Sequence, residues 1–179
     1  QAQVHEAEAG LGKHELAVGA ALGAVALAYA FAVPRGLPYD EPSHWLNVTH
    51  IARDWTLPRL GDPDVSYEAQ QGPLVYVIDA VIYRLTGTGT TGFYAVRVSG
   101  VLWLAAAAVL CLALLKAGWP RIPRAGRIAG TAVALGNPMV VGAAMSVQND
   151  IPALALALAA LWTATRFQHP VVVGLLAGA

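Results

Sequence analysis

Two long apolar runs, at residues 16–33 and 93–115, constrain the fold of this chain more than any other feature of the sequence. A helix needs about 20 apolar residues to cross the hydrocarbon core of a bilayer. Further apolar runs occupy residues 128–147 and 151–167, and another begins at residue 171. Only 12% of the residues are charged and the mean hydropathy is +0.53, whereas a soluble domain carries about 25% charged residues. The sequence therefore predicts an all-α integral membrane protein, a helical bundle with several spans.

The predicted organisation is a polar N-terminal segment, residues 1–14, followed by a single membrane domain, residues 15–179. The chain begins without Met, and its last apolar run, 171–179, is too short for a span, so we expect a longer protein. Cys111 is the only cysteine, which excludes an internal disulfide. Eleven basic residues balance eleven acidic ones, which argues against a nucleic-acid partner.

Residues 34–92 form a loop between the first two spans that is too polar to cross the membrane. Pro34 and Pro38 end the first span. Within the loop, residues 42–56 carry apolar side chains and two tryptophans at helical spacing, which predicts an amphipathic helix at the bilayer surface. Residues 73–86 predict a second short surface helix. An alternative in which residues 73–86 cross the membrane stays open.

The distribution of charge predicts an orientation. Basic residues in short loops mark the cytoplasmic side, and a basic loop covers residues 116–127. Residues 35–92 and the pair Asn149-Asp150 are then expected on the outer face. The lipid bilayer is the expected partner, in the form of a bacterial cytoplasmic membrane with the acidic loop outside. Eight acidic residues belong to the outer side: Asp40, Glu41, Asp54, Asp62, Asp64, Glu68, Asp79 and Asp150.

Several of these acids are candidates for chemistry. Asp40 and Glu41 directly follow the first span, where partial desolvation can prepare a carboxyl group for general-base catalysis. Asn149-Asp150 lies between two apolar runs, where an ionisable group is expensive unless it faces a polar cavity. Ordinary alternatives stay open: a helix cap for Asp40 and Glu41, solvation for Glu68, and a turn for Asn149-Asp150.

The histidines His44 and His50 follow Asp40 and Glu41 closely, which raises the question of a metal site. The spacing is not that of the HExxH zinc motif, and Pro42 interrupts the turn that would align Asp40 with His44. The sequence also contains no P-loop or GxSxG motif. We therefore expect neither a metal nor a cofactor.

Four stretches follow the first span in a characteristic order: YDEPSHWLNVTHIARDWTLP, YEAQQGPLVYVIDAVIYRLTG, AVRVSGV and SVQNDIPALALALAAL. This order resembles the N-terminal half of GT-C glycosyltransferases, in the branch of the protein O-mannosyltransferases and the aminoarabinose transferases of lipid A. The resemblance covers roughly residues 15–165. Each short motif is common by itself, whereas the ordered set is fairly specific.

The resemblance implies transfer of a sugar from a polyprenyl-phosphate donor to an acceptor at the outer membrane face. Asp40 would be the catalytic carboxylate, which accepts the proton of the acceptor group or orients that group, and Glu41 would support it. Arg97, at the start of its span, would contact a lipid phosphate through its guanidinium group. The implied substrate-binding residues are Glu68, Arg97, Asn149, Asp150 and His44.

The chain departs from this family at Gln71-Gly72-Pro73, where QQGPLVY replaces the more usual HQPPLYY. Two other functions stay open. One is a catalytically inert, truncated relative that serves as a structural subunit beside other membrane subunits. The other is a transporter fragment with Asp79 or Asp150 in its translocation path. The acids cluster outside the predicted spans, which favours the enzyme over the transporter.

Overall fold

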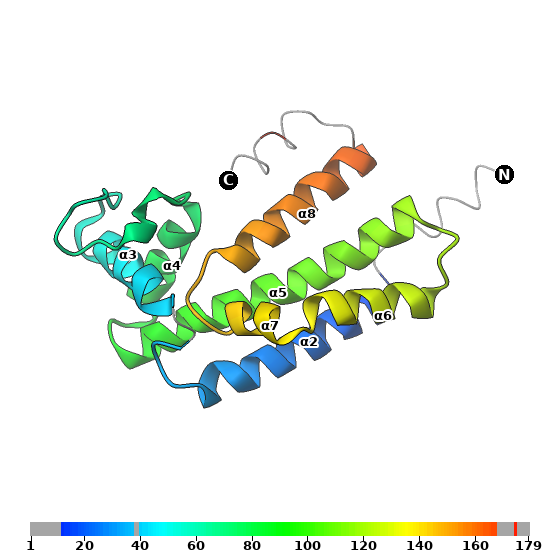
Figure 1. The fold of residues 1–179 in the computed structure, drawn as a ribbon, viewed down its shortest axis with the longest axis horizontal. Coiled ribbons are helices and arrows are strands. Elements are labelled where there is room, and N and C mark those ends of the chain that lie inside the picture. Colours follow the sequence, from blue (N-terminus) through cyan, green and yellow to red (C-terminus); the bar gives the residue numbers. More distant parts are fainter. Residues whose placement is uncertain (1–11, 38–39, 168–173, 175–179) are drawn as a thin grey trace.

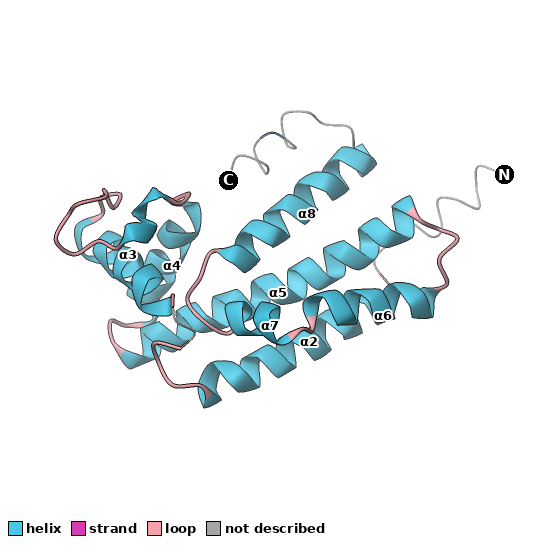
Figure 2. Ribbon diagram, viewed as in Figure 1, coloured by secondary structure: helices cyan, strands magenta, loops and turns pink. Residues whose placement is uncertain are grey.

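The computed structural model describes residues 12–37, 40–167 and 174. In this part of the chain all regular structure is helical, which confirms the predicted all-α class, and Figure 2 shows the helices joined by loops. The elements are α2 (Lys13–Ala32), α3 (Glu41–Asp54), the 3-10 helix η1 (Tyr67–Gln70), α4 (Leu74–Thr86), α5 (Thr90–Gly118), α6 (Arg124–Leu135), α7 (Pro138–Ala144) and α8 (Asp150–Phe167).

Helix α5 is the axis of the molecule, since it packs against α2, α4, α6, α7 and α8 (Figure 1). Its 29 residues correspond to a length of about 44 Å. Helix α2 turns small residues toward α5, among them the buried Gly19 and Gly23. A Cβ atom at Gly19 would lie 3.0 Å from the backbone oxygen of Ala105. The absence of a side chain therefore permits the close approach of the two helices, as in many membrane helix pairs.

Among the described residues, two helices are long and apolar enough to cross a membrane. They are α2, with a mean hydropathy of 1.7, and α5, with 2.5. Helix α8 matches the predicted run 151–167, but its apolar stretch, Asp150–Thr165, is shorter than the about 20 residues that a membrane span needs. Two such helices weakly indicate association with a membrane, and the larger number of spans expected from the sequence is not established.

The predicted span at residues 128–147 is not one helix. Helix α6 ends at Leu135 and α7 begins at Pro138. The Asn137 side chain caps α7, because its Oδ1 accepts hydrogen bonds from the backbone N–H groups of Met139 (3.0 Å) and Val140 (3.1 Å). Proline at the first helical position completes the start signal. The apolar run is therefore interrupted by a helix end and a helix start, which its hydropathy does not reveal.

Helices are present at both predicted places in the loop, residues 42–56 as α3 and 73–86 as α4, and their position at a bilayer surface stays a prediction. They pack against the first half of α5 around a partly aromatic core that includes Ile51, Tyr76 and Phe93. A second core, rich in alanine, lies between α2, α5, α7 and α8. Most of the predicted N-terminal segment 1–14 and of the run 171–179 lies outside the described residues.

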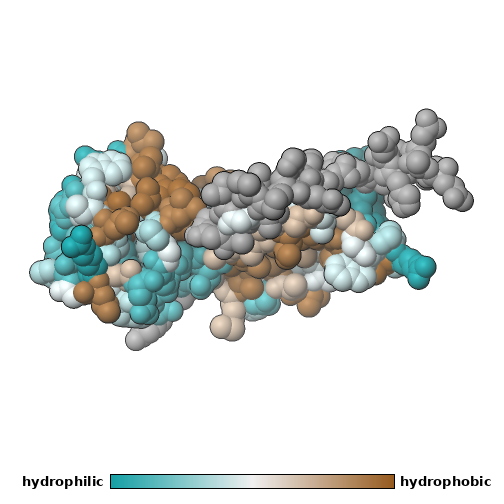
Figure 3. Space-filling model, turned by 90° about the horizontal axis from the view of Figure 1, so that it is seen from above, coloured by the Kyte–Doolittle hydropathy of each residue, from teal (hydrophilic) through white to brown (hydrophobic). Residues whose placement is uncertain are grey.

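Helices α3 and α4 and the loop between them lie at the end of the molecule where α5 begins, and the α5–α6 loop lies at the opposite end (Figure 1). Figure 3 shows hydrophilic residues at both ends of the visible face, with apolar residues over much of the body between them. The acid-rich segment and the basic loop are thus separated by the length of α5.

Candidate functional site

A buried ion pair fastens the α3–α4 layer to the helical body. Arg97 on α5 and Glu41 at the start of α3 are 0% and 1% exposed. Their side chains form a bidentate ion pair, in which Nε and Nη2 of Arg97 each donate to one carboxylate oxygen of Glu41 at 2.7 Å. The guanidinium also donates to the backbone oxygens of Ala30, at 2.7 Å, and Val33, at 2.8 Å, near the end of α2. Glu41 accepts a further bond from the backbone N–H of Val147, at 3.0 Å.

This arrangement gives Glu41 and Arg97 a structural role. The Arg97 Nη2 atom is also within hydrogen-bond distance of the backbone oxygens of Pro34 and Leu37, so protein acceptors surround the whole guanidinium group. The resemblance implies a lipid-phosphate contact for Arg97, whereas its donors are already used inside the protein. The carboxylate of Glu41 is likewise occupied, because it also accepts the N–H of Gly36 at 2.7 Å.

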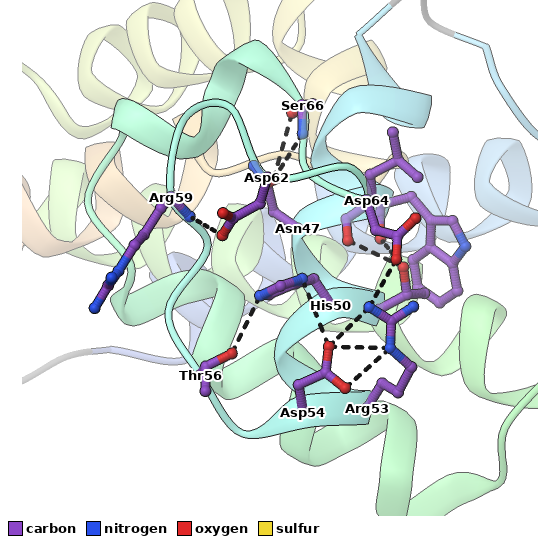
Figure 4. Close-up of polar contacts among 12 residues, drawn as sticks. Asn47, His50, Arg53, Asp54, Thr56, Arg59, Asp62, Asp64 and Ser66 are labelled. Carbon is purple, nitrogen blue, oxygen red and sulfur yellow. Dashed lines mark hydrogen bonds and ion pairs between the residues drawn. The ribbon is translucent and has the colours of Figure 1, made fainter.

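Three acids, Asp54, Asp62 and Asp64, form contacts that stabilise the loop between α3 and η1. Figure 4 shows Asp54 and Asp64 both paired with Arg53 on α3, with N–O distances of 2.7 and 2.9 Å. Asp62 accepts from the backbone N–H of Arg59 within the loop. A further contact joins the loop to α3, because the side-chain oxygen of Asn47 accepts from the backbone N–H and the hydroxyl of Ser66. These contacts set the position of η1, which follows Ser66 directly.

The charges of three further acids act on His44, a buried residue in the first half of α3. Burial lowers the pKa of His44, and the negative charges of Glu68, Asp150 and Asp40 oppose this effect. The three carboxylates therefore act on one imidazole, although they come from η1, the start of α8 and the turn before α3. Glu68 is buried, Asp40 is half-buried and Asp150 is exposed. Asp40 accepts a hydrogen bond from the Tyr67 hydroxyl at 3.2 Å.

A chain of side-chain hydrogen bonds runs from Glu68 to His44. The Gln71 amide nitrogen donates to the Glu68 carboxylate. The Tyr76 hydroxyl donates to the Gln71 amide oxygen at 3.3 Å, and the same hydroxyl lies 2.7 Å from Nδ1 of His44. Tyr76 is 1% exposed, and its burial raises the pKa of its hydroxyl. Gln71 lies in the turn where the sequence departs from the GT-C pattern, and the structure gives that turn a defined contact.

The pair Asn149-Asp150 is divided between interior and surface. Asp150 begins α8 and is exposed, whereas Asn149 is half-buried. The side-chain oxygen of Asn149 is buried and accepts no hydrogen bond from the described residues. Of the seven residues implied as site residues, the structure connects Glu68 to His44 through Gln71 and Tyr76, and the charges of Asp40 and Asp150 also act on His44. It places Glu41 and Arg97 in the ion pair.

A pocket of about 370 Å³ lies on the other side of Glu41. Its wall includes Arg35, Trp45, Tyr83 and Phe93. The Arg35 guanidinium carbon lies 4.8 Å from the centre of the Phe93 ring, and the residue is exposed. Among the described residues, no carboxylate forms an ion pair with Arg35. The pocket therefore combines aromatic walls with a positive charge that an anionic group can reach.

Asp79 is another buried acid, and its negative charge acts on Tyr76. It lies on α4, is 3% exposed, and accepts a hydrogen bond from the Ser99 hydroxyl on α5 at 2.8 Å. Burial raises the pKa of Asp79 to about 7, and the bond from Ser99 opposes part of this shift. The contact joins α4 to α5.

No group of three or more metal-binding side chains lies close together in the described part of the chain, and the expected absence of a metal stays a prediction. Sequence reasoning missed Tyr67, Gln71, Tyr76 and Arg35. Tyr67, Gln71 and Tyr76 belong to one quoted motif, but their types and spacing carry no signal for contact with Asp40 or His44. Arg35 could have been noted as a cation at the exit of an apolar run.

Comparisons with protein families, curated proteins and solved structures found no match to this chain.

Proposed function

We propose that this chain belongs to a GT-C-like membrane glycosyltransferase, which transfers a sugar from a polyprenyl-phosphate donor to an acceptor at the outer membrane face. The observation that carries the proposal is the polar network beside Asp40: Tyr67 donates to Asp40, and Glu68 is connected through Gln71 and Tyr76 to the buried His44. Carboxylates are costly to bring together and partly bury without a reason. This group lies at the end of the molecule where α2 and α5, the two candidate spans, meet the polar α3–α4 layer.

In this proposal Asp40 acts on the acceptor. Its carboxylate is half-buried and accepts a hydrogen bond from the Tyr67 hydroxyl through one oxygen, so it keeps capacity for another hydrogen bond. It would orient the acceptor hydroxyl or amine, or accept its proton, while the acceptor attacks the anomeric carbon of the sugar. The bond between that carbon and the phosphate oxygen breaks, and polyprenyl phosphate leaves with the electron pair.

Arg35 takes the phosphate contact that the resemblance implied for Arg97. Its guanidinium is exposed beside an aromatic pocket and is suited to bidentate contact with phosphate oxygens. It follows α2 directly, close to the predicted membrane boundary. Arg35→Gln is expected to raise the KM for the lipid donor, whereas Arg59→Gln in the loop between α3 and η1 serves as the matched control.

The decisive experiment replaces the carboxylate of Asp40. Membranes that contain the protein, expressed from its complete reading frame, are incubated with polyprenyl-phosphate mannose and polyprenyl-phosphate aminoarabinose, the donors of the families it resembles. Asp40→Asn keeps the shape, removes the charge and is expected to abolish transfer. Asp64→Asn removes an exposed acid from the same end of the molecule and is expected to leave transfer intact. Normal transfer by Asp40→Asn would refute the catalytic assignment.

The inert structural subunit remains the competing function. It predicts no sugar transfer by the wild-type protein with either donor, and co-purification with other membrane proteins. The same membranes test this alternative, because mild detergent extraction followed by size-exclusion chromatography reports any larger assembly.

A further inference from the structure

The hydrogen-bond chain from Glu68 to His44 has only one consistent direction. A carboxylate oxygen accepts hydrogen bonds, so the Gln71 side chain must turn its NH₂ group toward Glu68. The Gln71 amide oxygen then faces Tyr76, and an amide oxygen is also an acceptor. The single hydrogen of the Tyr76 hydroxyl is therefore used in the bond to Gln71.

The next contact follows from the use of that hydrogen. The Tyr76 oxygen and His44 Nδ1 are 2.7 Å apart, a distance at which one of the two atoms must carry a hydrogen toward the other. With the Tyr76 hydrogen used in the bond to Gln71, Nδ1 is the atom that donates to the Tyr76 oxygen. In a neutral imidazole only one ring nitrogen is protonated, and Nε2 is then an acceptor with a free lone pair.

We propose that Glu68, acting through Gln71 and Tyr76, fixes the proton of His44 on Nδ1 and leaves Nε2 as a proton acceptor. Glu68, Gln71 and Tyr76 are positioning residues in this scheme, since each acts on His44 through its neighbour. Among the described residues, the side-chain hydrogen bond of His44 is made by Nδ1, with the Tyr76 hydroxyl. Burial favours the neutral imidazole by lowering the pKa of His44, so the resting state can accept a proton.

The surrounding charges suit the protonated form that would follow. Glu68, Asp150 and Asp40 all raise the pKa of His44 and so stabilise an imidazolium once it forms. The role in catalysis rests on the proposed function: the O–H or N–H bond of the acceptor breaks, its hydrogen passes to Nε2, and the freed electron pair forms the new bond to the sugar. Asp40 then orients the acceptor.

The tautomer can be measured without any assay of sugar transfer. The protein is labelled with ¹⁵N-histidine, purified in detergent, and its imidazole nitrogens are observed by NMR, with His44→Gln used to assign the signals among the five histidines. We expect a protonated Nδ1 and an unprotonated Nε2, the reverse of the tautomer that free histidine prefers in water. A protonated Nε2 in the wild-type protein would overturn the proposal.

Two variants test the hydrogen-bond chain from Glu68 to His44. Tyr76→Phe removes the hydroxyl and is expected to shift His44 toward the ordinary tautomer, and Glu68→Gln is expected to do the same because an amide can donate as well as accept. Tyr83→Phe alters another tyrosine of α4 that packs edge-on against Trp45, and is expected to leave the tautomer unchanged. Circular dichroism checks that each variant is folded. An unchanged tautomer in folded Tyr76→Phe and Glu68→Gln would show that the chain does not position His44.

The proposed role of His44 Nε2 as the proton acceptor is tested separately, by measuring sugar transfer. His44→Gln is expected to lower sugar transfer by about 100- to 10,000-fold, the range for loss of a general base. Full transfer by His44→Gln would exclude Nε2 as the proton acceptor. If the tautomer is as expected but Asp40→Asn transfers sugar normally, the proposed role of Asp40 fails while the hydrogen-bond chain stands.

Discussion

Glu41 and Arg97 connect four segments of the chain through one buried contact. Their atoms meet the end of α2, the start of α3, α5 and the segment after α7. Two charges taken out of water are stable together only when their hydrogen bonds are complete, and here protein acceptors and donors surround both groups. Removal of either partner leaves a charge in the interior without its counter-ion.

Arg97→Gln is therefore expected to lower the free energy of unfolding by about 3–5 kcal/mol. Denaturation of the purified protein in detergent, followed by circular dichroism, measures this loss. Arg53→Gln is the matched control, because the side chain of Arg53 is 56% exposed and its surface ion pairs contribute about 0–1 kcal/mol. Equal losses for the two variants would contradict the structural role of Arg97.

Asp79 gives the fold a pH dependence. Burial raises the pKa of Asp79 from 3.8 to about 7, so the folded state holds the proton more tightly than the unfolded state. Its contribution to stability is complete below about pH 4 and decreases as the pH rises toward 7. Asp79→Asn cannot titrate, so its unfolding temperature should vary less than that of the wild type when measured at intervals between these pH values. Parallel curves for the two proteins would show that Asp79 is ionised in the fold.

At the scale of elements, the contact of α2 with α5 depends on small side chains. The interface would place a Cβ atom of residue 19 against the Ala105 oxygen and the Val109 side chain, each at 3.0 Å. Buried alanines, Ala26 and Ala30, continue the contact toward the C-terminal end of α2. A larger residue at position 19 must therefore push the helices apart or shift one along the other.

Gly19→Leu is expected to lower the free energy of unfolding by about 1–3 kcal/mol through overpacking. Ala24→Leu adds the same kind of bulk to an exposed position of the same helix and should have little effect. Thermal denaturation in detergent compares the two variants. Similar melting temperatures for them would mean that α2 does not pack on α5 through this face.

At the scale of the whole molecule, the acidic and basic segments lie at opposite ends of α5. If α2 and α5 cross a membrane, the two segments must lie on opposite sides of it. The structure also guides the choice of probe positions. Leu60 on the acidic side and Arg121 in the basic loop are both exposed, so a probe can reach either position.

Single cysteines at positions 60 and 121, introduced into a Cys111→Ser background, test this topology. A membrane-impermeant maleimide is expected to label intact cells at position 60 and to label position 121 only after permeabilisation. The expected sides follow from the positive-inside rule. Labelling of both positions from the same side would rule out the arrangement.

The sequence by itself determined the features that depend on neighbouring residues. Apolar length predicted α2 and α5, and helical spacing after Pro42 predicted α3, because such signals act within one or two helical turns. The same local signals were present at Gly136-Asn137-Pro138, where the hydropathy of the whole run 128–147 concealed them. The acids were also recognised as a cluster, but not sorted into those that hold the loop and those whose charges act on His44.

Only the tertiary structure decided that sorting, because the contacts join residues far apart in the chain. Arg97 is 56 residues from Glu41, and Val147 is 106 residues from it. An arginine at the start of a span can meet a lipid phosphate or a buried carboxylate, and its own sequence neighbours are the same in both cases. The choice depends on whether the end of α2 supplies backbone acceptors and α3 supplies an acid at that point. Burial then converts these groups from solvated charges into a structural ion pair.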